Sequence, residues 1–305
     1  MRGHARRRVT EAEAEGVLFP SSLQPLAGHP AVRARGESTL RELLVRTACN
    51  WQGGIASFEV EVVAGLCGRL ASAGPGCPIP ETARQVALTI ATDEGYHAYA
   101  AREFIADVER FTGIVPVAPE DETLLLKGLV AARGAAPDTL TREVETMVLC
   151  FAEHFVTESL YGLTREADAG SAFQVAMREH LIDEGRHQGF FRLLLRQLWS
   201  ELDEERRRAL GRIVPLFLDA FLCDAAAVRQ TNLELLEQSG FAAEEADRII
   251  RETFEALARR SRLTKPQLPH AQNCLDLAAG SGMLEHGPTR DAFVERGWIE
   301  ARPPA

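Results

Sequence analysis

The spacing of apolar and polar positions indicates helices almost throughout the chain from about residue 37 onward. Apolar side chains recur every three or four residues, and no segment alternates apolar and polar positions for long enough to predict a strand. Turn-forming stretches such as Gly74-Pro75-Gly76 separate the segments. An all-α fold follows, with predicted helices at 38–49, 55–73, 80–113, 121–133, 138–168, 171–202, 203–222, 224–238, 243–261 and 289–297.

Residues 1–36 lack this periodicity. They mix Arg-rich and Glu-rich patches with Pro20, Pro25, Gly28 and Pro30. Such a composition favours a flexible N-terminal tail. No boundary is visible in the rest, so residues 37–305 are predicted to form a single domain with helices beyond residue 200 added to the bundle.

Composition narrows the class of protein. Hydrophobic residues make up 46% of the 305 residues, which is ample for a large core, and the formal net charge of −10 disfavours nucleic acid and anionic membranes as partners. No apolar run approaches the roughly 20 residues that span a bilayer, and no apolar segment follows the basic N-terminus as in a secretory signal. The six cysteines form no C-x-x-C pair, so we expect reduced thiols and a cytoplasmic protein.

A repeated pentapeptide carries the strongest chemical signal. Asp93-Glu94-Gly95-Tyr96-His97 recurs 90 residues later as Asp183-Glu184-Gly185-Arg186-His187. Each copy contains Glu-x-x-His, which places a carboxylate and an imidazole about one turn apart on one helical face. Two such helices direct four ligands at one point, and helical bundles with a di-iron or di-manganese centre add one glutamate from each of two further helices.

Two glutamates upstream of the copies fit that requirement. Glu59 lies among apolar neighbours and precedes Glu94 by 35 residues, while Glu153 lies on a helix that is apolar all round and precedes Glu184 by 31. A lone carboxylate on an apolar face is costly unless it is protonated or binds a metal. The sequence therefore predicts two helix pairs, each contributing Glu and Glu-x-x-His.

Alternatives remain at several of these positions. Glu61 competes with Glu59. Glu158, on the Phe151/Phe155 stripe at nearly the opposite side of the same helix, competes with Glu153. His180 lies on the face of Glu184 and His187, where the first copy has Ile90, so it is either a seventh ligand or a core histidine. Mixed carboxylate and imidazole ligands suit iron or manganese.

Three further polar residues lie close to the candidate ligands in sequence. Asp93 and Asp183 come just before each ligand glutamate and either fix the tautomer of a ligand imidazole or are surface carboxylates. His154 lies on a different face from Glu153 and is expected to be structural.

The set Glu59, Glu94-x-x-His97, Glu153 and His180-x-x-x-Glu184-x-x-His187 resembles the ligand pattern of the di-iron arylamine N-oxygenases, the p-aminobenzoate N-oxygenase family. The third histidine distinguishes that family among ferritin-like di-iron proteins, and the resemblance covers about residues 50–200. It implies a ferritin-like bundle with two iron ions bridged by Glu94 and Glu184. It further implies that Glu59 and His97 complete one iron site, and that Glu153, His180 and His187 complete the other.

The resemblance also implies a function. We expect an O₂-dependent N-oxygenase that oxidises an amine, most plausibly an aromatic one, towards hydroxylamine, nitroso or nitro through a peroxide bound between the two ferric ions. An external reductase or small reductant, a homodimer and a biosynthetic role are expected with it. The alternatives are a C–H hydroxylase or desaturase with the same metal site, and an iron-storage or non-catalytic helical protein.

Overall fold

The computed structural model describes residues 8–116, 124–164, 171–260, 264–268 and 271–301, and within these ranges it contains helices and no strand. The predicted all-α fold is therefore confirmed, as is the presence of further helices after residue 200. Side chains are described for these ranges except for 124–125 and 156–164. The helices are α1 (Glu11–Glu15), α2 (Pro30–Ala34), α3 (Glu37–Phe58), α4 (Gly65–Ala73), α5 (Glu81–Thr112), α6 (Leu124–Ala135), α7 (Thr141–Thr164), α8 (Ala172–Glu201), α9 (Glu204–Leu222), α10 (Ala225–Gln238), α11 (Ala243–Arg260), α12 (Ala271–Gly280) and α13 (Gly287–Glu295).

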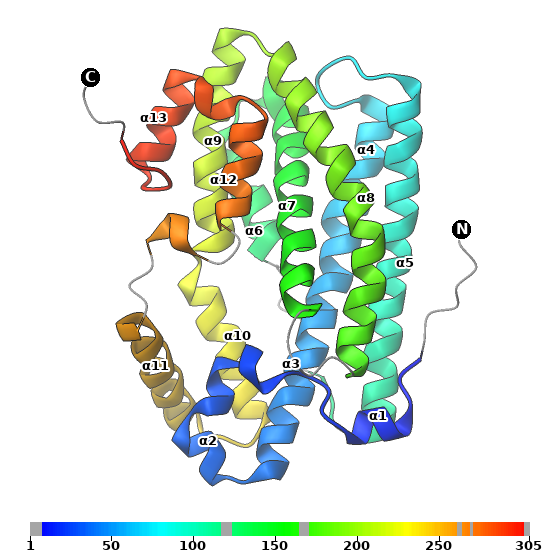
Figure 1. Cartoon of the computed structure of the whole chain (residues 1–305), viewed down its shortest axis with the longest axis vertical. Coiled ribbons are helices and arrows are strands. Elements are labelled where there is room, and N and C mark those ends of the chain that lie inside the picture. Colours follow the sequence, from blue (N-terminus) through cyan, green and yellow to red (C-terminus); the bar gives the residue numbers. More distant parts are fainter. Residues whose placement is uncertain (1–7, 117–123, 165–170, 261–263, 269–270, 302–305) are drawn as a thin grey trace.

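A four-helix core carries the site. α3 and α4 pack along α5, and α7 packs along α8, so that each predicted pair of ligand-bearing helices lies side by side. α5 and α8 run in opposite directions (Figure 1). Outside the core, α6 packs on α9, α9 on α13, and α10 on α11. No helix in the described ranges has the length and apolar character needed to cross a membrane.

The first two predicted helices form one continuous rod in the structure. We predicted a break between Cys49 and Ile55, but α3 continues through Gly53 and Gly54 to Phe58. A π-helical segment, Glu59–Ala64, then leads directly into α4. The helix tolerates the glycine pair because its face is buried against α5, and tertiary packing overrides the low helix propensity of glycine.

The described part of the N-terminal segment differs from the flexible tail that we expected. Between residues 8 and 36 it forms short helical turns, and Leu18, Phe19, Leu26 and Val32 are buried in the core at one end of the bundle. The Phe19 ring lies 5.0 Å from that of Phe173 on α8. These turns are held by local caps and apolar anchors, which leave no helical periodicity in the sequence.

The core consists of two apolar clusters, one toward each end of the bundle. On α5 one cluster reaches Ile90 and the other begins at Ala98, and on α8 one ends near Met177 and the other begins at Phe191. The candidate ligands on these two helices lie in the gap between the clusters. The fold therefore buries a polar layer between two apolar ones.

Candidate metal centre

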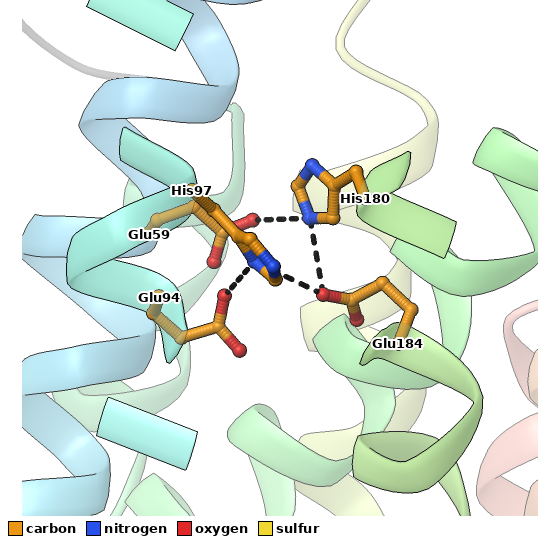
Figure 2. Close-up of side chains that lie close together, drawn as sticks. All are labelled: Glu59, Glu94, His97, His180 and Glu184. Carbon is orange, nitrogen blue, oxygen red and sulfur yellow. Dashed lines mark hydrogen bonds and ion pairs between the residues drawn. The ribbon is translucent and has the colours of Figure 1, made fainter. Parts of the chain in front are cut away.

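All seven candidate ligands converge on one point in the core. Glu59 comes from the start of the π-helical segment, Glu94 and His97 from α5, Glu153 from α7, and the remaining three from α8. Each is at most 1% exposed. Figure 2 shows five of them, with the side chains of α5 and the π-helical segment facing those of α8. The two groups whose ligand atoms can surround an ion are Glu59, Glu94, His97, His180 and Glu184, and Glu94, Glu153, Glu184 and His187.

Glu94 and Glu184 belong to both groups. One oxygen of Glu184, Oε1, lies 3.5 Å from Nδ1 of His97 and 3.5 Å from Nδ1 of His187. Glu94 directs its two oxygens in different directions, Oε2 lying 2.8 Å from Nδ1 of His97 and Oε1 2.7 Å from Nδ1 of His187. Both glutamates are therefore shared by the two groups of possible ligands.

The structure groups His180 differently from the sequence-based expectation. We expected it with Glu153 and His187, but its Nε2 lies 3.4 Å from Oε1 of Glu59, and its ring centroid is 3.9 Å from that of His97. The antiparallel course of α5 and α8 explains this placement. Because the two helices run in opposite directions (Figure 1), a residue one turn before Glu184 on α8 lies level with a residue one turn after Glu94 on α5. His180 therefore lies beside His97, as Figure 2 shows.

The spacing of the ligand atoms fits metal ions. Two ligands at right angles around an ion with bonds of about 2.1 Å lie about 3.0 Å apart. The contacts between carboxylates and imidazoles within the two groups run from 2.7 to 4.0 Å. Both oxygens of Glu59 and one of Glu184 are buried and make no hydrogen bond with the described residues. Buried carboxylate oxygens left in this way call for a cation.

The electrostatics of the carboxylates lead to the same conclusion. Burial raises the pKa of Glu59 well above its ordinary value, and the charges of Glu94, Glu184 and Glu153 raise it further. Burial and the charges of Glu184 and Glu94 likewise raise the pKa of Glu153. Two divalent ions would balance four ionised carboxylates, so that no proton is needed to neutralise the layer.

The two histidines of the repeated motif both direct Nδ1 inward and Nε2 outward. Nε2 of His97 lies 3.4 Å from Oδ2 of Asp183, and Nε2 of His187 lies 3.4 Å from Oδ2 of Asp93. Each aspartate thus contacts the histidine of the other copy. An Nε2–H that donates to aspartate leaves the Nδ1 lone pair free for a metal, so both aspartates lie where a tautomer-fixing partner is needed.

The pKa shifts follow from these contacts. The hydrogen bond with His97 lowers the pKa of Asp183 to about 2, with burial acting against the shift and Arg186 adding to it. Burial lowers the pKa of His187, but its contacts with Glu184 and Glu94 outweigh that effect and raise it to about 12. The carboxylates therefore hold positive charge at this point, which a metal ion supplies when it displaces the proton.

Of the competing residues, Glu61 and His154 do not join the described cluster. Glu61 is exposed on the outer side of the π-helical segment. His154 is half-buried and lies in neither group. The side chain of Glu158 lies outside the described residues. Two features of the site were not predicted from the sequence. One is the π-helical turn at Glu59, for which the sequence carries no clear signal. The other is the pair of contacts that Arg186 makes with Asp183 and Asp93, which the difference between the two pentapeptides could have indicated.

A helical bundle that buries four carboxylates and three imidazoles in two groups with two shared glutamates defines a candidate two-metal carboxylate protein. The family described as p-aminobenzoate N-oxygenase AurF matches the chain over residues 8–263. The chain therefore belongs to this family, as the resemblance predicted, and is an oxygenase. It is 24% identical to a 4-aminobenzoate N-oxygenase of Streptomyces thioluteus over 235 residues, which cover 76% of this chain and 68% of the relative.

Proposed function

We propose that the chain is an O₂-dependent di-iron N-oxygenase that oxidises an aromatic amine at nitrogen. The observation that carries the proposal is the pair of buried ligand groups that share Glu94 and Glu184. Family membership and the name of the Streptomyces relative support the reaction class and an arylamine substrate. Two bound iron ions would supply the reduction of O₂ and the transfer of one oxygen atom to the amine nitrogen.

Each of the seven ligands has a place in this proposal. Glu59, His97 and His180 would hold one ion, Glu153 and His187 would hold the other, and Glu94 and Glu184 would contribute to both. Four carboxylates balance the charge of two ferrous ions, and the three imidazoles remain neutral. Because every ligand is almost fully buried, the bundle excludes bulk water from the ions.

The proposal includes an external source of electrons. Conversion of an amine to a hydroxylamine by O₂ consumes two electrons and two protons and releases the second oxygen atom as water. The electrons come from a separate reductase or a small reductant. A homodimer is proposed as well, on the family resemblance alone.

Iron content tests the metal site. The protein is loaded with Fe(II) under anaerobic conditions, desalted and assayed for iron per chain, as wild type, Glu184→Ala and Glu61→Ala. We expect about two irons in the wild type, a sharp fall in Glu184→Ala because a bridging ligand is lost, and no change in the control, whose carboxylate is exposed. Iron near zero in the wild type would contradict the proposal.

Product analysis tests the reaction. The iron-loaded protein is incubated with a reductant, O₂ and each of a panel of aromatic amines, and the masses of the products are determined by mass spectrometry. N-oxidation adds oxygen at the amine nitrogen, hydroxylation adds it at carbon, and desaturation removes two hydrogen atoms. Iron binding without any product from amines, together with oxidation of a carbon substrate, would favour the hydroxylase or desaturase alternative. Iron uptake far above two per chain would favour storage.

A further inference from the structure

The two copies of the pentapeptide differ at their fourth position, where the first has Tyr96 and the second Arg186. The Tyr96 ring is 41% exposed and stacks on Tyr99, with ring centroids 6.3 Å apart. The guanidinium of Arg186 instead lies beside the two aspartates that contact Nε2 of His97 and Nε2 of His187. The second copy therefore places one arginine beside two similar contacts, the one between His97 and Asp183 and the one between His187 and Asp93.

Arg186 contacts both aspartates with one nitrogen. Its Nη2 donates a hydrogen bond of 2.7 Å to Oδ1 of Asp183 and lies 3.5 Å from Oδ2 of Asp93. Asp183 contacts His97, and Asp93 contacts His187. One side chain from the second copy thus connects, through two carboxylates, to an imidazole in each candidate metal group.

The aspartates need such a partner in order to stay in place. The side chains of Asp183 and Asp93 are 26% and 37% exposed, so each can rotate toward water. Their two negative charges also repel each other and the buried glutamates. Arg186, itself half exposed, offers several N–H donors in a fixed plane, which can hold two carboxylates near one point. Exposed ion pairs contribute little to folding stability, so the main effect of this one is on the orientation of its neighbours.

We propose that Arg186 is a positioning residue that holds Asp93 and Asp183, and through them the imidazoles of His97 and His187, so that both metal positions depend on this one side chain. The inference rests on the proposed function, since it needs two metals in the site. The shorter contact is with Asp183, so the group that contains His97 depends on Arg186 more strongly than the group that contains His187.

Metal-binding titrations test the inference without any need for activity. The probe is Co(II), whose visible absorption reports ligand geometry, and the variants are Arg186→Ala, Arg186→Lys and Arg186→Tyr, the last of which copies the first pentapeptide. Arg196→Ala is the matched control, because it removes an exposed arginine of the same helix that makes no hydrogen bond or ion pair with the described residues of the site. Each Arg186 variant is also combined with Glu59→Ala or Glu153→Ala, which each leave one metal position.

We expect Arg186→Ala to weaken Co(II) binding about 10-fold and to shift the absorption bands in both backgrounds, because outer partners of ligand histidines typically contribute 10- to 100-fold to metal affinity. The loss should be larger in the Glu153→Ala background, which keeps His97. Arg186→Lys should recover part of that loss, and Arg186→Tyr should not. Without metal, the Arg186 variants should have the same melting temperature as the control Arg196→Ala.

The outcomes separate the two proposals. If wild type binds two metals and Arg186→Ala binds them with the same affinity and spectrum, the inference is wrong while the proposed function stands. A loss confined to the Glu153→Ala background would mean that Arg186 serves Asp183 alone, which also overturns the inference. A lower melting temperature with an unchanged spectrum would assign Arg186 a structural role instead. A wild type that binds no metal would overturn the proposed function itself.

Discussion

At the scale of single residues, His180 shows what distinguishes the two halves of the site. The first copy has Ile90 at the matching position, and Ile90 belongs to an apolar cluster, whereas His180 lies beside Glu59 and His97. One metal group therefore has two imidazoles and the other has one. Because of this difference, a substitution of one ligand should affect metal binding at one of the two groups more than at the other.

Replacement of His180 by isoleucine, the residue of the first copy, should remove one metal per chain and leave the other. The ion that is lost should be the one held by Glu59 and His97, because His180 belongs to that group. Iron content after anaerobic loading should fall from about two to about one, in a site that remains filled with a side chain of similar volume.

Two double variants identify the position that is lost. His180→Ile with Glu59→Ala should retain about one iron, since both changes affect the same group, and His180→Ile with Glu153→Ala should retain almost none. The reverse pattern would support the arrangement that the family resemblance implied, with His180 beside Glu153.

Stability should depend on pH in a way set by the same residues. In the metal-free folded protein the pKa values of two glutamates and two histidines are raised, namely those of Glu59, Glu153, His97 and His187. The stability from the two histidines is fully present below their ordinary pKa of about 6.5 and is lost as the pH rises toward their folded values. The raised pKa values of Glu59 and Glu153 also make stability fall as the pH rises. The reason is that the unfolded chain loses these two protons at a lower pH than the folded chain does. His180, whose pKa is lowered, adds nothing further above about 6.5.

The metal-free protein should therefore melt at progressively lower temperature as the pH rises from about 6.5 to about 9. Metal binding needs the deprotonated ligands, so the increase in melting temperature on adding Co(II) should grow over the same range. Thermal melts with chelator and with Co(II) measure both trends, and Glu59→Gln should flatten the first. A metal-free melting temperature that climbs with pH above 6.5 would contradict the pKa directions.

The sequence predicted which residues lie together in the core, but not how these residues are distributed between the two groups of possible ligands. Glu59, Glu153 and the two Glu-x-x-His motifs were identifiable because a carboxylate on an apolar helical face needs a partner. The grouping of His180 depends on the relative direction of α5 and α8, which is a tertiary property. The contacts of Asp93 and Asp183 also cross between the copies, so no pattern within one copy reveals them.

At the scale of elements, the π-helical segment Glu59–Ala64 determines which way the first ligand points. Its hydrogen bonds span one residue more than those of an α-helix, which inserts an extra residue into the helical repeat. Glu59, Val62 and Val63 are buried there, while Val60 and Glu61 face outward. The segment thus lets α3 and α4 both bury their apolar faces with Glu59 between them. The sequence predicted one regular helix over 55–73 and gave no indication of this segment.

Deletion of Glu61 should convert the π-helical segment to an α-helix and displace Glu59 from the centre. Removing one residue shortens the spacing from Glu59 to the buried Val62 and Val63 to two and three positions, so Glu59 can no longer share one helical face with both of them. Iron content should fall sharply while the far-ultraviolet circular dichroism stays helical. The substitution Glu61→Ala, which keeps the residue count, should bind iron like the wild type. Equal iron in the deletion variant would show that the π-helical turn does not position Glu59.

At the scale of the whole molecule, the polar layer lies between two apolar clusters, and the N-terminal segment contributes to one of them. Val9, Leu18, Phe19 and Leu26 pack in the cluster that also contains Phe173, which begins the helix carrying His180. Arg8 adds hydrogen bonds to the buried carboxylate of Asp107 on α5. The bundle end below the metal layer is therefore closed by residues that lack helical periodicity, which is why the sequence did not assign them to the core.

Replacement of Phe19 by alanine should destabilise the fold by about 3–5 kcal/mol, the range for a buried phenylalanine that leaves a cavity. Phe19 is fully buried against Phe173, and the ring of Phe173 in turn lies 6.3 Å from that of Phe104 on α5, so the cavity opens between the N-terminal segment and two ligand-bearing helices. Urea denaturation of the metal-free protein measures the change in unfolding free energy. Val17→Ala is the control, because that side chain is 61% exposed and should change stability by no more than about 0.5 kcal/mol. A loss below about 1 kcal/mol for Phe19→Ala would mean that the N-terminal segment does not unfold together with the bundle.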